Sequence, residues 1–143
     1  MSAESKPLVG ILVGSESDRE GMQAALDELD ERSISYEFNV LSAHRDPQKV
    51  AEYAASAARR GLRVLIAGAG MAAALPGVVA AHTELPVIGV PLRSEKSALG
   101  GLDALLSIAQ MPPGVPVACV SIDGSRNAAV LAARILAHPL SFV

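Results

Sequence analysis

The segment ISYEFNVLSAHRDPQKVAEYAASAARR, residues 34–60, decides the fold of this chain. Residues 34–41 alternate apolar and polar side chains, a pattern that predicts a β-strand. Residues 47–60 predict a helix, because Asp46 can act as its N-cap and Pro47 suits its first position. Residues 42–46 therefore form a strand-to-helix turn, which is where open α/β sheets place their ligand sites.

The same alternation of short apolar runs and longer helical segments continues along the whole chain. It predicts strands at residues 8–13, 34–41, 62–67, 85–91 and 116–122. It predicts helices at residues 18–32, 47–60, about 75–82, 102–109 and 125–137, with Gly61 after the second of them. We expect one α/β domain over residues 1–143, a three-layer αβα arrangement with a parallel sheet. Fold-level analogy adds a flavodoxin-like strand order, 2-1-3-4-5.

Composition limits the classes of function. Half of the residues are hydrophobic but only 3% are aromatic, so the core consists of Ala, Val, Leu and Ile, which suits helices packed closely on a buried parallel sheet. The net charge of −3 gives no basic surface for nucleic acid or for an anionic membrane. Cys119, the only cysteine, is expected to be buried, so neither a disulfide nor a cysteine metal site forms within one chain.

One uncharged stretch, residues 64–81, is long enough to raise the question of a membrane span. Its three glycines and Pro76 break it into strand, turn and helix, so we expect no membrane span. The N-terminus does not have the pattern of a signal peptide. These observations predict a soluble, cytoplasmic protein.

The turns after the first two predicted strands carry the groups that can do chemistry. In the first, Gly14 allows a ligand to approach the backbone, and Ser15 and Ser17 can bond phosphate oxygens at a helix start. The alternative is that Ser17 or Asp18 only caps the following helix. In the second, His44 could take and return a proton near neutral pH.

Two further alternatives stay open for these turns. His44 could be a surface or structural side chain, and the neighbouring Arg45 could pair with Asp46 or Asp18. The third turn, residues 68–77, offers backbone donors and a dry wall of small residues, or simply close helix packing. No spacing of His, Asp and Glu matches a metal site.

Together and in this order, these turns resemble the PurE family of purine biosynthesis, whose members are N5-carboxyaminoimidazole ribonucleotide mutases. The resemblance runs from residue 9 to about residue 136. Its carriers are residues 14–18, 42–45, 67–70, 75–77, 85–91, 101–103, 110–112 and 127–129.

The resemblance implies a homo-octamer with sites between subunits and with no metal or organic cofactor. It implies a reaction that moves a carboxyl group of an aminoimidazole ribonucleotide from the exocyclic nitrogen to ring carbon C4, with carbon dioxide as intermediate. It implies that His44 is the general acid and base. The substrate contacts that it implies are Ser15, Ser17, Asp18, Ser42, Ala43, Arg45, Gly68, Gly70, Ala72, Ala73 and Leu75.

The chain departs from the family pattern at several places. The family usually has His at the position of Ala74, often Gly at Met71 and usually Thr at Asp46. The loop at residues 94–99 is slightly longer than usual, and the long C-terminal helix of the family is absent. A similar third turn, with Gly-Met and Ala-Leu-Pro, occurs in the LarB enzymes.

Three other functions therefore stay open. The first is a PurE- or LarB-like carboxylase or decarboxylase that acts on another nucleotide. The second is an aminoimidazole ribonucleotide carboxylase that uses free carbon dioxide; its animal-type branch has Arg-Ser-Asn in the third turn, where this chain has Gly68-Ala69-Gly70. The third is a nucleotide sensor without catalysis, for which His44 would have no use.

Overall fold

The structure, a computed structural model, describes residues 6–138. Five parallel strands form one sheet in the order β2-β1-β3-β4-β5, which confirms the predicted fold class and strand order. The strands are β1 (Val9–Val13), β2 (Tyr36–Val40), β3 (Val64–Gly70), β4 (Val87–Leu92) and β5 (Ala118–Cys119). The helices are the short η1 (Glu16–Asp18), α1 (Arg19–Glu31), α2 (Pro47–Ala57), α3 (Leu75–Ala81), α4 (Leu102–Ala109) and α5 (Ser125–Ala137).

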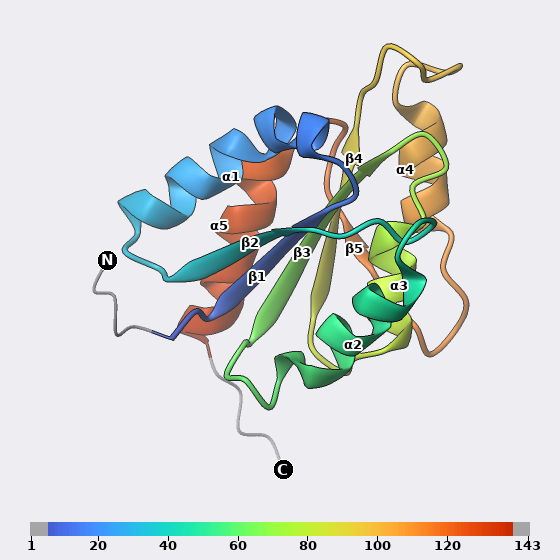
Figure 1. Ribbon diagram of the computed structural model, residues 1–143. Helices are drawn as coiled ribbons and strands as arrows, with labels where there is room; N and C mark the ends of the chain where they lie inside the picture. The colour runs from blue at the N-terminus through green and yellow to red at the C-terminus, as the bar shows by residue number, and fades with distance from the viewer. Residues whose placement is uncertain (1–5, 139–143) are drawn as a thin grey trace.

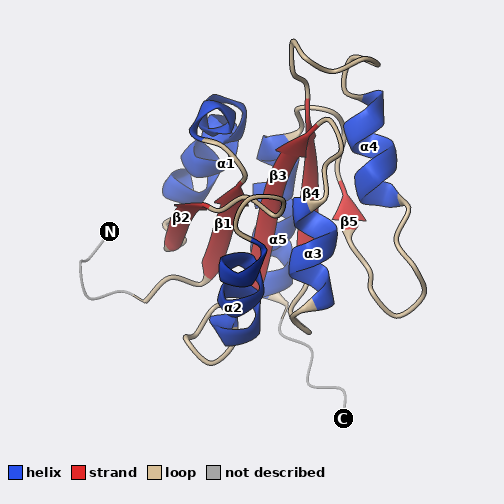
Figure 2. Ribbon diagram, turned by 45° about the vertical axis from the view of Figure 1, so that its right-hand side comes forward, coloured by secondary structure: helices blue, strands red, loops and turns tan. Residues whose placement is uncertain are grey.

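The sheet is covered on both faces, as Figures 1 and 2 show. Helices α1 and α5 pack on one face around a core that includes Ile11, Met22 and Ala129. Helices α2, α3 and α4 cover the other face around Leu12, Leu65 and similar side chains. The central strands are buried throughout because each of their faces meets a helix, and this explains their continuous apolar sequences.

The predicted boundaries fail most clearly at the last strand. Residues 116–122 were expected to form it, but only Ala118 and Cys119 pair with β4. Pro116 has no N–H to donate to a ladder, and β5 lies at the edge of the sheet, where a single neighbour supports it. Cys119 is consequently half-buried, not buried as expected. Partial burial raises the pKa of its thiol.

Helix α2 begins at the predicted residue, Pro47, but does not end where the sequence predicted. Gly61 takes a positive φ of 101°, and Leu62 donates its N–H to the Ala57 carbonyl, but α2 ends at Ala57, three residues before the predicted end, and residues 58–61 form a turn that closes at the glycine. Asp46 stands at the N-cap position as expected, but its side chain makes no capping hydrogen bond. Pro47 fixes the start of the helix instead.

An ion-pair cluster joins the two helices of the first core. The buried carboxylate of Glu28 on α1 accepts hydrogen bonds from Arg126 on α5, at 2.8 Å, and from Arg32, at 2.7 Å. These two guanidinium groups, Arg126 first, hold the pKa of Glu28 below its ordinary value of 4.5. The cluster therefore stabilises the contact between α1 and α5 while Glu28 is ionised.

We expect Glu28→Gln to lower the melting temperature at pH 7. Because the folded-state pKa of Glu28 is lowered, the stabilisation is present above pH 4.5 and is lost as the pH falls through the folded-state value. The difference in melting temperature between the two proteins should therefore shrink in acid. Thermal unfolding from pH 3 to pH 7 measures it, with Glu20→Gln on the exposed face of α1 as control. Equal melting temperatures at pH 7 would contradict the role of the cluster.

Candidate active site

Three turns meet at the carboxyl ends of β1, β2 and β3. Val13 pairs in register with Val40 of β2 and with Gly68 of β3, so the three strands reach this edge at nearly the same level. The chain leaves β1 toward α1 on one face of the sheet and leaves β3 toward α3 on the other. The two connections diverge, and the crevice between them is the switch point at which open α/β sheets bind ligands.

A cavity of about 110 Å³ lies in this crevice. It takes residues from all three turns, which confirms that they converge in space although they are far apart in the sequence. The lining residues are Gly14, Asp18, Ser42, Ala43, His44, Ala69, Gly70, Ala72, Ala73, Ala74 and Leu75.

The first turn supplies a carboxylate to the cavity. The Ser15 hydroxyl accepts a hydrogen bond from the Ser17 backbone N–H at 3.3 Å and lies 2.9 Å from the Ser17 hydroxyl, so Ser15 caps η1. The alternative that Ser17 or Asp18 provides the side-chain cap is wrong, because Asp18 makes no capping bond to α1. Asp18 instead lines the cavity. Burial raises its pKa, and a backbone hydrogen bond from Ser15 acts in the opposite direction.

The second turn supplies the imidazole. The Ser42 hydroxyl accepts a hydrogen bond from the Arg45 N–H at 3.2 Å, and the Ser42 carbonyl accepts one from the Asp46 N–H at 2.8 Å. These two bonds fix the backbone of the turn. His44 is exposed and lies on the cavity wall, so it is not turned into the core. Arg45 is exposed, and no ion pair to Asp46 or Asp18 is found among residues 6–138.

The third turn supplies a wall without charged groups. Residues 72–74 contribute methyl groups, and Ala74 stands at the N-cap position of α3. The turn is tight: Ala73 donates to the Met71 carbonyl at 2.9 Å, and Ala74 donates to the Ala72 carbonyl at 2.7 Å. Met71 has a positive φ of 55°, which is uncommon for a residue with a side chain. Its side chain is 44% exposed beside the site.

Four of the predicted site residues do not line the cavity. Ser15, Ser17 and Arg45 are exposed members of the turns that form it. Gly68 is buried inside β3, where a Cβ atom would lie 2.6 Å from the Met22 sulfur, so this glycine makes room for α1. Gly68 therefore has a packing role, and the cavity lining of the third turn begins at Ala69.

The prediction missed Ala69 and did not assign Ala74 to the substrate. Ala69 could have been found from the two-residue period of a strand, which places it on the same face as Ala67 and Leu65. That is the face on which α3 begins. Ala74 did carry a signal, because the resemblance gives the family a His at this position, but the prediction did not name Ala74 itself as a substrate contact.

Comparison with known proteins identifies the family of this chain. A family model described as AIR carboxylase matches residues 8–141. The chain belongs to the AIR carboxylase family. An N5-carboxyaminoimidazole ribonucleotide mutase of Bacillus subtilis is 59% identical over 133 residues, which are 92% of this chain and 81% of the Bacillus protein.

Other members of the AIR carboxylase family extend the comparison. A phosphoribosylaminoimidazole carboxylase of Schizosaccharomyces pombe is 58% identical over 92% of this chain, which corresponds to only 23% of that longer protein. The crystal structure of Treponema denticola PurE has a TM-score of 0.80 at 33% identity, covering 94% of this chain and 82% of that one. The resemblance to PurE that the sequence indicated is therefore confirmed.

Two further findings concern what the described part of this AIR carboxylase family member lacks. Within residues 6–138, no cluster of three or more His, Cys, Asp or Glu side chains could hold a metal ion. None of the helices in that range has the length and apolar character needed to cross a bilayer.

We expect Asp18→Asn to raise the melting temperature at pH 7 while it weakens substrate binding. The raised pKa means that ionisation of Asp18 destabilises the folded state. This destabilisation is fully present above the folded-state pKa and absent below the ordinary pKa of 3.8. The amide removes the penalty, so the gain in melting temperature should vanish in acid. Thermal unfolding at pH 3 and pH 7, with calorimetric titration of substrate, measures both effects. Loss of stability at pH 7 would contradict the prediction.

Proposed function

We propose that this protein is an N5-carboxyaminoimidazole ribonucleotide mutase of purine biosynthesis. It moves the carboxyl group from the exocyclic nitrogen to ring carbon C4 and gives 4-carboxy-5-aminoimidazole ribonucleotide. The observation that carries the proposal is the position of His44, the one imidazole on a cavity that small apolar residues of the third turn also line. The mutase named in Bacillus subtilis, at 59% identity, supports it.

The proposed reaction needs one proton donor and acceptor. The bond between the exocyclic nitrogen and the carboxyl carbon breaks, the exocyclic nitrogen takes a proton from His44, and carbon dioxide is released. The electron-rich C4 then attacks carbon dioxide, and His44 removes the C4 proton to restore the aromatic ring. The two proton transfers cancel, so the reaction is an isomerisation that a single imidazole can serve.

The cavity suits the proposed intermediate. A volume of about 110 Å³ holds a few water-sized molecules. Carbon dioxide released there faces the methyl groups of Ala72, Ala73 and Ala74, and we propose that walls from other subunits keep it from bulk water. Asp18 is the only carboxylate among the lining residues, and we propose that it holds a polar group of the substrate.

The volume also supports the proposed assembly. Pockets for small-molecule ligands usually measure about 300–1,000 Å³, so one chain encloses only part of a ribonucleotide. We propose that Ser15, Ser17, Ser42 and Arg45 bind the ribose and phosphate at the open side. Further walls come from other subunits of a cytoplasmic homo-octamer.

One experiment tests the function against its alternatives. The purified protein is given N5-carboxyaminoimidazole ribonucleotide in buffer that contains ¹³C-labelled bicarbonate. A mutase gives product with an unlabelled carboxyl group, and mass spectrometry of the product measures the label. In a parallel reaction, aminoimidazole ribonucleotide and labelled bicarbonate replace the substrate.

A carboxylase that uses free carbon dioxide is the second candidate, because the S. pombe relative of that name is 58% identical. It would give labelled product in the parallel reaction and would contradict the mutase. Binding without product in either reaction would indicate a sensor. If the protein neither binds nor converts these ribonucleotides, the result would favour another nucleotide as its substrate. The departures at Met71 and Ala74 suggest this for a LarB-like enzyme.

A further inference from the structure

The connection between β4 and α4 is folded around one hydroxyl group. We call residues 93–101 of this connection the Ser97 loop. The half-buried Ser97 hydroxyl donates to the Asp103 carboxylate at 2.6 Å. It accepts hydrogen bonds from the backbone N–H groups of Leu99 and Gly101, at 3.3 and 3.1 Å. A serine hydroxyl has one donor and two acceptor positions, so the loop uses all of them.

Both ends of the Ser97 loop are held by side chains. At its end, the carboxylate of Asp103 accepts the Ser97 hydroxyl and, at 3.0 Å, the Ala104 N–H. These donors, Ser97 first, hold the pKa of Asp103 below its ordinary value of 3.8, so the carboxylate is ionised at neutral pH. At its start, the guanidinium of Arg93 donates to the Gly100 carbonyl at 3.3 Å. Loops with adjacent ends and an interior filled by their own side chains are frequently functional.

The Ser97 loop begins beside the active-site cavity. The cavity residue Gly70 is the last residue of β3 and pairs in register with Leu92 of β4. A Cβ atom on Gly70 would lie 3.0 Å from the Leu92 carbonyl oxygen and 3.7 Å from the Ser94 Cβ atom. The Ser94 carbonyl in turn accepts the Ser97 N–H at 3.0 Å. Figure 1 shows the loop beyond the carboxyl end of β4, at the end of the sheet where the three turns of the site lie.

The contact with Ser94 lies directly before the wall of small residues. Gly70 is followed by Met71, whose φ is 55°, and then by the cavity residues 72–74. Glycine restricts its own backbone less than any other residue, so the conformation at this junction depends on what packs against it. Ser94 is the side chain of the Ser97 loop that packs there. A loosened loop would therefore let the wall shift.

We propose that Ser97 and Asp103 are positioning residues, which hold the Ser97 loop against Gly70 and so keep residues 72–74 in place around released carbon dioxide. The role of the wall rests on the proposed function. If the wall shifts, carbon dioxide can leave before C4 attacks it. Such a turnover releases aminoimidazole ribonucleotide, because the exocyclic nitrogen keeps the proton from His44. His44 then takes a proton from solvent, since none is removed from C4.

Hydrogen–deuterium exchange tests the positioning without any need for activity. In Ser97→Ala, we expect the peptide of residues 68–77 to exchange about tenfold faster than in the wild type, with α5 unchanged. Ser97→Thr keeps the hydroxyl and should restore the slower exchange. Ser107→Ala is the matched control, because the exposed Ser107 hydroxyl donates to the Asp103 backbone carbonyl, at 2.9 Å, and makes no contact with the loop's own hydrogen bonds.

A second pair of variants tests the contact itself and covers the case in which Ser97→Ala does not fold. Ser94→Gly removes the Cβ atom next to Gly70 and leaves the bond between Ser97 and Asp103 intact. Ser94→Ala keeps that Cβ atom and is the control, since both variants lose the hydrogen bond from the Lys96 N–H. We expect faster exchange at residues 68–77 in Ser94→Gly only.

The products of the reaction test the consequence for catalysis. With N5-carboxyaminoimidazole ribonucleotide as substrate, Ser97→Ala and Asp103→Ala should release aminoimidazole ribonucleotide in about ten times more turnovers than the wild type, with KM little changed. Spontaneous decarboxylation, measured without enzyme, is subtracted. The double variant should be no worse than Ser97→Ala alone, because the two side chains act through one hydrogen bond.

The outcomes separate the positioning from the proposed function. Unchanged exchange at residues 68–77 in the folded variants would overturn the positioning role. Faster exchange along the whole chain would also overturn it, because it would show only a general loss of stability. Faster exchange confined to the third turn, without extra release of aminoimidazole ribonucleotide, would overturn the role of the wall. If the wild type has no mutase activity but the exchange changes as expected, the positioning stands and the proposed function fails.

Discussion

Replacing His44 with asparagine is expected to lower kcat by about 10²- to 10⁴-fold while the affinity for the ribonucleotide changes little. Asparagine keeps a polar side chain of similar size at the cavity wall but can neither donate a proton to the carbamate nitrogen nor accept one from C4. Because His44 is exposed at the cavity and outside the hydrophobic core, the variant should fold normally.

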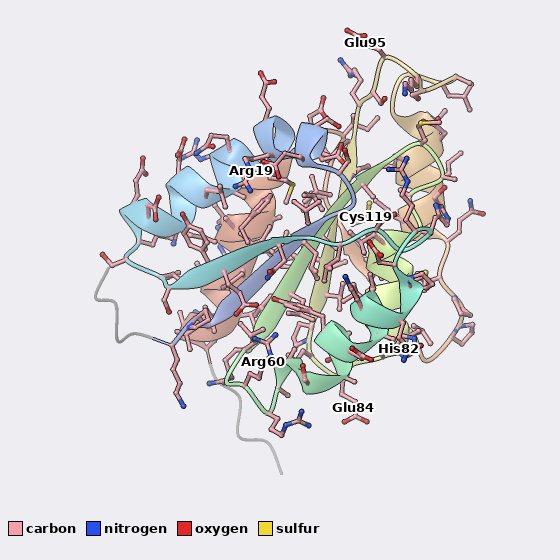
Figure 3. All side chains as sticks on the ribbon, in the orientation of Figure 1. Arg19, Arg60, His82, Glu84, Glu95 and Cys119 are labelled. Atoms are coloured by element: carbon pink, nitrogen blue, oxygen red, sulfur yellow. The ribbon has the colours of Figure 1, made fainter. Side chains whose placement is uncertain are left out.

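Steady-state kinetics and calorimetric titration of substrate separate the two effects. His82→Asn is the matched control, because His82 is exposed at the end of α3 away from the cavity (Figure 3). A His44→Asn variant with kcat within threefold of the wild type would show that another group moves the proton. A drop in affinity as large as the drop in kcat would mean that His44 holds the substrate and is not the acid and base.

The sequence predicted the sheet well because its signals are local and mutually consistent. Each buried strand is a short apolar run followed by a helix with a recognisable start or stop, such as Pro47 or Gly61. The three turns of the site could be predicted for the same reason, since parallel strands bring their carboxyl ends to one edge. Eight of the proposed site residues, among them Asp18 and His44, do line one cavity.

The remaining features depend on contacts between distant residues, which a single sequence does not display. Gly68 looked like part of a ligand loop, but its lack of a side chain is required by Met22 of α1. Strand β5 pairs with β4 only through Ala118 and Cys119, whereas β2 at the other edge keeps five residues, so the edge position alone does not set its length. The exposure of Leu102 and Leu106 on α4 could not be recognised either, because the helical period alone does not tell which apolar side chains face the sheet.

Met71, where the family often has glycine, has an unusual backbone conformation in the third turn. Its left-handed backbone, with φ of 55°, costs a residue with a side chain about 1–2 kcal/mol, whereas glycine adopts it readily. Strain of this kind is often kept at functional sites. The exposed Met71 side chain is therefore kept at a local energetic cost in the third turn, directly before the cavity-lining residues 72–74 in the sequence.

Arg45→Ala is expected to raise KM for the ribonucleotide by about 10- to 150-fold, with a smaller change in kcat. The backbone of Arg45 is fixed by its hydrogen bond to the Ser42 hydroxyl, and its side chain is exposed beside the N-terminus of α2. Free N–H groups and the positive end of the helix dipole favour a phosphate there. A hydrogen bond between charged groups contributes about 1.5–3 kcal/mol, which corresponds to the expected change in KM.

The role of Arg45 is specific to the phosphate, so the decisive comparison uses substrates with and without it. Binding of the dephosphorylated nucleoside should be nearly the same in Arg45→Ala and in the wild type, whereas binding of the ribonucleotide should weaken. Arg45→Lys should recover part of the affinity, because lysine keeps the charge but not the paired donors of a guanidinium group. Arg59→Ala removes an exposed positive charge near the other end of α2. It controls for the electrostatic effect on binding of losing any positive charge. Equal weakening for both substrates would place the phosphate elsewhere and leave Arg45 with a structural role in the turn.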